Sequence, residues 1–182
     1  MYKYNFIAIL LMCFIIQNNY SQNKNPILSL DFNNNINDIS GFNHISQKHG
    51  NITYGKDRIN NSCSAIYLDG NSYLSIANNS ILENINNFTV SAWIKNDPSN
   101  DGNTWISIIC KGDKISETKN NPQYRAQIFQ GQNQSTISIN TLFTEYDPNF
   151  KNHLIAPKKW HHIAITFDGK YVQLYVNGDL IY

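Results

Sequence analysis

The chain has 182 residues, of which 41% are hydrophobic and 15% are charged, and its formal net charge at pH 7 is +1. This length allows one domain with a sizeable core. The lysine and arginine residues are scattered along the chain, which argues against a nucleic acid or an acidic membrane as a partner recruited by charge.

Residues 1–22 have the pattern of an export signal peptide. Lys3 supplies the positive charge, an unbroken apolar run follows over 6–16, and the stretch 17–22 is polar. The apolar run is too short to span a bilayer comfortably, which disfavours a membrane anchor. We therefore expect a secreted or cell-surface protein with no membrane span after the signal is cleaved.

The rest of the chain reads as a short linker, 23–26, followed by one domain over 27–182. Alternating apolar and polar residues in short runs bounded by turn residues predict strands. One helical turn is expected at 80–84, where Ser80 and Glu83 match a capping box. Many strands with almost no helix predict an all-β sandwich or jelly roll of two antiparallel sheets. The expected strands are 27–32, 52–54, 64–68, 73–76, 88–95, 105–111, 125–130 and 136–140.

The last stretch, 160–182, predicts a three-stranded antiparallel meander. Two alternating apolar runs are separated by Asp168-Gly169, and Asn177-Gly178 follows the second run. Both dipeptides suit two-residue type I′ turns, because both central positions of such a turn need a positive φ.

Several segments carry a family resemblance. The sequence WHHIAITFDGKYVQLYVNG over 160–178 resembles the late hairpin of LamG-like (laminin G-like, concanavalin A-like) jelly-roll domains of secreted bacterial proteins. Segment 88–95, which reads FTVSAWIK, is similar to a strand that these domains carry earlier. Segment 108–112 is similar to their "K-G" segment. Segment 65–70 is similar to their "F-D-G" strand, and segments 30–32 and 37–41 resemble their opening.

The resemblance implies a concanavalin A-like jelly roll over 27–182. Related domains continue beyond the meander through a strand that reads roughly G-x-I-D-D-x-R-I-Y, which this sequence lacks. The resemblance therefore implies that the domain is incomplete at its C-terminus, either as a fragment of a longer protein or as a truncated gene product.

The fold hosts many functions, so the resemblance does not choose a ligand. Our leading hypothesis is a secreted, non-catalytic recognition module that binds carbohydrate or a cell-surface or extracellular protein. The alternative is a structural or adhesion segment of a larger exported protein with no small ligand. A glycoside hydrolase-related domain ranks last.

The distribution of carboxylates argues against an enzyme. Retaining glucanases that share this fold carry an E-x-D-x-x-E strand, which sets two carboxylates roughly 5 Å apart across a sugar. The three glutamates here, Glu83, Glu117 and Glu145, lie too far apart along the chain for one such strand. Adjacent histidines, His161 and His162, point to opposite faces of a strand and cannot chelate one ion.

Two pairs of aspartates are candidates for a structural Ca²⁺. Asp97 and Asp101 occupy positions one and five of a calcium-loop pattern, but position twelve is Ile108, which excludes an EF-hand. A looser site that adds backbone carbonyls remains an alternative to an ordinary solvated loop, which the composition favours. The second pair, Asp31 with Asp38, rests on the resemblance, because related domains often hold calcium near the opening strand.

Aromatic side chains are candidates for ligand contacts, because sugar-binding modules stack aromatic faces on pyranose rings. We single out Trp105, Tyr124 and Tyr175 as candidate binding residues. The alternative is that they pack as ordinary strand residues. For Trp93 and Trp160 we expect a structural role, because related domains keep tryptophan there regardless of ligand.

Cys63 and Cys110 are the cysteines that remain once Cys13 leaves with the signal peptide. An oxidising compartment permits them to pair. A disulfide also requires their Cα atoms to lie within about 7 Å, which the sequence does not establish. The pairing therefore stays open at this point.

Overall fold

The computed structural model describes residues 25–83, 87–97, 104–111, 124–130, 135–141 and 153–181. These residues form twelve strands and one short helix, α1 (Ser80–Glu83). The strands are β1 (Ser46–His49), β2 (Ile52–Gly55), β3 (Ala65–Leu68), β4 (Tyr73–Ile76), β5 (Phe88–Lys95), β6 (Thr104–Lys111), β7 (Tyr124–Gln130), β8 (Ser135–Thr141), β9 (His153–Ile155), β10 (Trp160–Phe167), β11 (Val172–Val176) and β12 (Asp179–Leu180).

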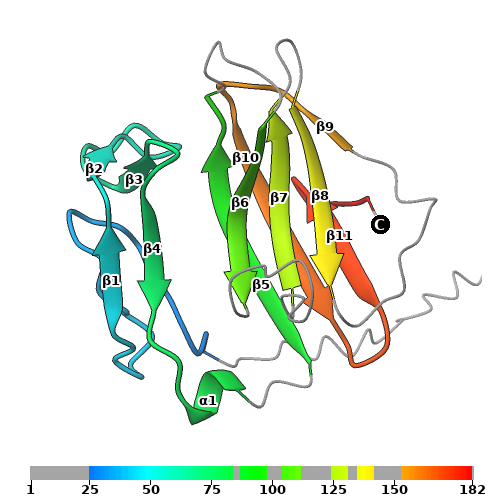
Figure 1. The fold of residues 1–182 in the computed structure, drawn as a ribbon, viewed down its shortest axis with the longest axis horizontal. Helices are drawn as coiled ribbons and strands as arrows, with labels where there is room; N and C mark the ends of the chain where they lie inside the picture. The colour runs from blue at the N-terminus through cyan, green and yellow to red at the C-terminus, as the bar shows by residue number, and fades with distance from the viewer. Residues whose placement is uncertain are drawn as a thin grey trace, which may run out of the picture.

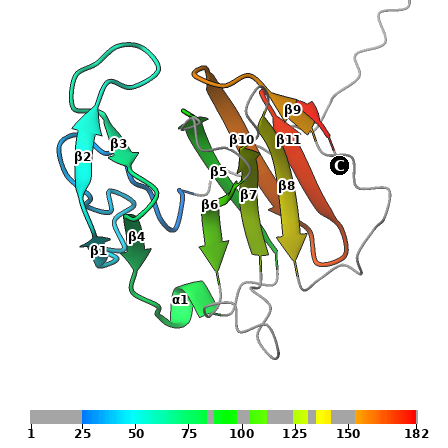
Figure 2. The same ribbon diagram turned by 45° about the horizontal axis from the view of Figure 1, so that its top comes forward.

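Two four-stranded antiparallel sheets form the main body. One sheet has the order β12-β11-β10-β5 and the other has the order β6-β7-β8-β9. The two sheets lie face to face as two layers (Figures 1 and 2). The predicted all-β sandwich of antiparallel sheets is confirmed. Its core consists of Ala126, Ile128, Ile137, Ile155, Ile163, Ile165, Phe167, Val172, Leu174 and Val176.

Alternation along the strands decides which side chains enter this core. In β5, burial alternates residue by residue, with Phe88, Val90, Ala92 and Ile94 on the partly buried side, as predicted. In β10 and β11 the alternating apolar residues are buried in the same way. Because successive side chains of a strand point to opposite faces, the residues between them lie on the solvent side of the sheet.

The N-terminal strands form two small antiparallel sheets, β1-β4 and β2-β3. They lie beside the sandwich, near β5 and β6, and α1 connects them to β5 (Figure 1). The predicted strand at 27–32 is wrong: only Leu30 makes an isolated bridge, to Asp38. The sequence also missed β1, because Ser-Gln-Lys-His has no apolar alternation, and it missed β9, which is three residues long.

The two predicted type I′ turns have different outcomes. Asn177 and Gly178 have φ values of 53° and 94°, which confirms the turn between β11 and β12. Only Gly169 has a positive φ at the other site. There the Asp168 carboxylate accepts the backbone N–H groups of Lys170 and Tyr171, at 2.8 and 2.7 Å. This local capture of N–H groups favours a longer connection between Phe167 and Val172 over a two-residue turn.

The predicted signal peptide, 1–22, lies outside the described residues. Within the described ranges, no helix is long and apolar enough to cross a membrane.

Candidate functional site

The solvent-facing side of the β12-β11-β10-β5 sheet carries aromatic and polar side chains. The antiparallel register places His162 of β10 opposite Trp93 of β5, and Ala164 opposite Tyr175 of β11. Trp93 is 47% exposed, which is a large exposure for a tryptophan in a strand. We call this surface the outer face and define it by Trp93, Trp160, His162, Thr166, Gln173 and Tyr175.

A shallow, open depression of about 350 Å³ lies on the outer face, lined by Trp93, His162, Asn177 and Gly178. The rings of Trp93 and His162 lie 5.2 Å apart at an interplanar angle of 51°. The lining therefore combines a large aromatic surface with imidazole, amide and backbone groups that can form hydrogen bonds.

Asn177 holds the edge of this depression in place. Its Oδ1 accepts the backbone N–H of His162 at 3.0 Å, and its own backbone N–H donates to the His162 carbonyl at 2.8 Å. Its Nδ2 lies 3.2 Å from Nδ1 of His161, whose Nε2 lies 3.0 Å from the Ala156 carbonyl. The turn after β11 is thus bound to the start of β10, which positions His162 beside Trp93.

Tyr175 lies on the outer face, as its strand position predicts. Its hydroxyl donates to Oε1 of Gln173 at 3.1 Å, and the same oxygen accepts the Thr166 hydroxyl at 3.4 Å. The other two aromatic candidates, Trp105 and Tyr124, belong to β6 and β7 of the opposite sheet. Their side chains are outside what the structure describes, and the three candidates are divided between two sheets.

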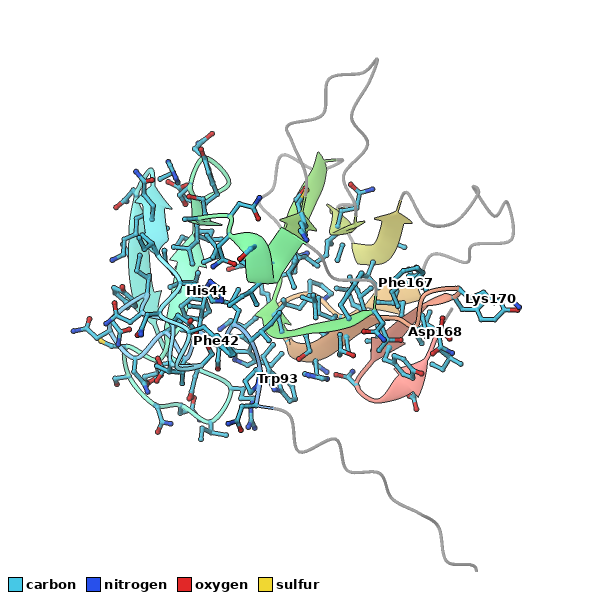
Figure 3. All side chains as sticks on the ribbon, turned by 90° about the horizontal axis from the view of Figure 1, so that it is seen from below. Phe42, His44, Trp93, Phe167, Asp168 and Lys170 are labelled. Carbon is cyan, nitrogen blue, oxygen red and sulfur yellow. The ribbon has the colours of Figure 1, made fainter. Side chains whose placement is uncertain are left out.

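Two cations lie over tryptophan rings of the outer face, one over the exposed Trp93 and one over the half-buried Trp160. The guanidinium carbon of Arg58, in the loop between β2 and β3, is 4.7 Å from the centre of the Trp93 ring. The Lys95 ammonium is 5.3 Å from the centre of the Trp160 ring. Figure 3 shows Trp93 where the N-terminal strands approach the β5 side of the sandwich.

We expected only a structural role for Trp93, and the structure places its side chain, 47% exposed, in the lining of the depression. The strand pattern already indicates that Trp93 points outward, because it alternates with Ala92 and Ile94, which face the core. A tryptophan on the polar side of an amphipathic strand has no core to enter, and such a position indicates a surface role.

Asp38, one of the calcium candidates, has a different set of partners. Its carboxylate accepts the backbone N–H groups of Ser29, Ser40 and His44 at 3.0, 2.9 and 3.0 Å, and the Ser40 hydroxyl at 2.8 Å. Burial raises the pKa of this carboxyl, but the donors from His44, Ser29 and Ser40 outweigh burial and hold the pKa well below its usual range. These four donors occupy the oxygen lone pairs that a metal ion would need.

The remaining aspartate candidates have separate partners. Asp31 accepts the backbone N–H and the side-chain amide of Asn33, at 3.1 and 2.8 Å. Asp97 pairs with Lys158 at 3.5 Å on the surface, and Asp101 lies outside the described residues. Among the residues that the structure describes, no group of three or more histidine, cysteine, aspartate or glutamate side chains could hold a metal ion.

Cys63 and Cys110 are both exposed, and no disulfide joins them in the described part of the chain. Cys63 lies in the loop before β3 and has a φ of 56°, whereas Cys110 lies in β6. Peptide mapping of the protein without reduction tests whether the two sulfurs pair in an oxidising environment.

Comparison with known proteins identifies the family of most of the sandwich. Residues 68–182 match the family model described as the Concanavalin A-like lectin/glucanases superfamily. One solved structure, "Crystal structure of HCR/D-Sa-GBL1/C", matches with a TM-score of 0.45 and 21% sequence identity, over 85% of this chain and 38% of that chain. The present chain thus spans well under half of that protein's length. No match was found among curated proteins.

Proposed function

Because the chain belongs to the concanavalin A-like lectin/glucanase superfamily, we propose that it binds carbohydrate through the depression beside Trp93. The observation that carries this proposal is the exposed indole of Trp93, which lines an open depression together with His162 and Asn177. Aromatic rings provide a flat apolar surface, and a few convergent polar groups orient a bound ligand.

We propose that this activity is recognition without catalysis. Glycoside hydrolysis ordinarily uses a pair of carboxylates placed on either side of the scissile bond. Among the residues that the structure describes, the lining consists of a tryptophan, a histidine, an asparagine and a glycine, none of which carries a carboxylate. This lining favours a binding module, whose partner is a glycan on a cell surface or in the extracellular space.

We also propose that the protein acts outside the cytoplasm. The apolar run 6–16 after Lys3 supports an export signal. Mass spectrometry of exported material should find a mature chain that starts near residue 22. Exported protein that retains Met1, or protein found only in the cytoplasm, would contradict this proposal.

A glycan array probed with the protein and with a Trp93→Ala variant tests the binding site. We expect the substitution to weaken binding to the recognised glycan about 30-fold, the size of effect seen when a central aromatic anchor is lost. Tyr171→Ala is the matched control: Tyr171 is an exposed aromatic that also lies under a cation, Lys170, at 4.7 Å. It follows the opposite end of β10, beyond Phe167, so binding should be unchanged. Equal binding by the Trp93 variant and the wild type would refute the proposed site.

A further inference from the structure

Arg58 comes from a part of the chain that the family match does not include. The match begins at residue 68, and Arg58 lies in the loop between β2 and β3, yet its guanidinium covers Trp93. We propose that Arg58 makes the depression selective for saccharides that carry an anionic group, either a carboxylate or a sulfate. This inference rests on the proposed function and names the ligand class of the same site.

The loop that carries Arg58 is held in a defined conformation. The Asp57 carboxylate accepts the backbone N–H groups of Ile59 and Asn61, each at 2.9 Å, and the Asn61 side-chain amide at 3.1 Å. Backbone bonds join Asp57 N–H to the Asn61 carbonyl and Asn60 N–H to the Asp57 carbonyl. Arg58 is therefore presented from a compact turn that is bonded across its base.

The charge of Arg58 is available to a ligand. Asp57, its neighbouring carboxylate, accepts the donors of its own turn, and the charge of Arg58 contributes to lowering the Asp57 pKa. The two side chains are not close enough to form an ion pair, and no other ion pair involves Arg58 among the described residues. The described residues that line the depression carry no negative charge. One carboxylate, that of Asp179, belongs to the residue that directly follows Gly178 in sequence. Lys95 carries a positive charge and lies two positions from Trp93 on the outward side of β5.

The guanidinium group suits an anion held against Trp93. Its planar fork of N–H donors matches a carboxylate or sulfate through two parallel hydrogen bonds, and such charge-assisted bonds are stronger than neutral ones. Stacking over Trp93 holds this fork against the ring that lines the depression. A sugar ring that contacts the indole would bring a charged substituent within reach of Arg58, whereas a neutral sugar would leave the guanidinium without a new partner.

Matched saccharide pairs test the inference. We would measure binding of oligogalacturonate and its neutral methyl ester, and of a sulfated galactan and the same galactan after desulfation. We expect at least one anionic member to bind about tenfold more tightly than its neutral counterpart, the gain typical of one charge-assisted contact. The pair that shows the difference distinguishes carboxylate from sulfate. Raising the salt concentration should weaken this preference.

Arg58→Gln should abolish the preference, so that the charged and neutral members bind equally well. The control is Lys48→Gln, which removes another cation stacked on an aromatic ring, 4.6 Å from the centre of Tyr54, in the same N-terminal strands. It should retain the preference. Arg58→Lys, which keeps the charge but loses the fork, should retain only part of the preference and provides a second readout if the glutamine variant folds poorly.

The outcomes separate the two proposals. Equal binding of charged and neutral members by the wild type, with loss of binding in Trp93→Ala, would overturn the role of Arg58 and uphold the carbohydrate site. An unchanged preference in Arg58→Gln would also overturn it. If the wild type bound no saccharide, or if Trp93→Ala bound saccharides as well as the wild type does, the proposed function would be refuted and this inference with it.

Discussion

The side-chain Oδ1 of Asn177 accepts a hydrogen bond from the backbone N–H of His162 at 3.0 Å, between residues 15 positions apart in sequence. Asn177 also occupies the left-handed region, with a φ of 53°. One residue therefore forms the turn after β11 and binds that turn to the start of β10. Asparagine suits both roles, because it tolerates positive φ better than most residues and carries an amide that forms hydrogen bonds.

Two substitutions at Asn177 separate these roles. Asn177→Gly removes the side-chain hydrogen bonds and keeps a residue that adopts positive φ freely. Asn177→Ala removes the same bonds and adds the steric cost of left-handed backbone, about 1 kcal/mol. Urea unfolding should therefore show the alanine variant to be less stable than the glycine variant by about that amount. Equal free energies of unfolding would contradict the conformational role of Asn177.

Asp38→Ala should destabilise the N-terminal part of the protein. The substitution leaves the N–H groups of Ser29, Ser40 and His44 without their acceptor, and losing the acceptor of partly buried donors costs about 1–3 kcal/mol. Asp31→Ala is the control, since Asp31 accepts two exposed hydrogen bonds from one neighbour. It should change the free energy of unfolding by less than about 0.5 kcal/mol.

The contribution of Asp38 should depend on pH in a defined direction. Its donors hold the folded-state pKa below the ordinary aspartate value, so the folded protein favours the ionised form. The stabilisation is fully present above the unfolded-state pKa of about 3.9 and is lost as the pH falls below it toward the folded-state pKa. The difference in free energy of unfolding between wild type and Asp38→Asn should shrink on acidification from pH 6 to pH 2. A difference that stayed constant would contradict the prediction.

His44 connects three segments of the N-terminal region. It is 6% exposed, with Nε2 2.8 Å from the Ile27 carbonyl and Nδ1 2.7 Å from the side-chain amide of Asn79. His44→Ala should lower the free energy of unfolding by about 1–3 kcal/mol, because both partners lose a hydrogen bond. Phe42 lies beside His44 (Figure 3), with ring centres 6.2 Å apart. Its side chain is 48% exposed, so Phe42→Ala should have a much smaller effect in the same denaturant titration.

Leu174→Ala should show that the free energy of unfolding depends on the side chains packed between the two sheets. Leu174 is 0% exposed and pairs in register with Ile165. Truncation of a fully buried leucine typically costs about 2–5 kcal/mol. Thr166→Ala, on the outward side of the neighbouring strand, should stay within about 0.5 kcal/mol of wild type. Similar losses in both variants would contradict the assignment of the core face.

The sequence by itself was sufficient to predict the architecture of the sandwich. Alternation in 88–95 predicted β5 and its buried side, and Asn177-Gly178 predicted a type I′ turn. These features depend on interactions between residues close in sequence, so the pattern of apolar and turn residues carries them. The same local reasoning failed at Asp168, whose carboxylate captured N–H groups, and at β1, whose polar residues show no period.

Only the tertiary structure decided which residues lie together at the candidate site. Trp93 and His162 are neighbours because of the register between β5 and β10, and Asn177 joins them through the turn that follows β11. Arg58 reaches Trp93 because the N-terminal strands lie beside the sandwich. Such contacts result from the packing of whole sheets, whose positions depend on many weak apolar contacts at once. No local pattern of residues encodes them.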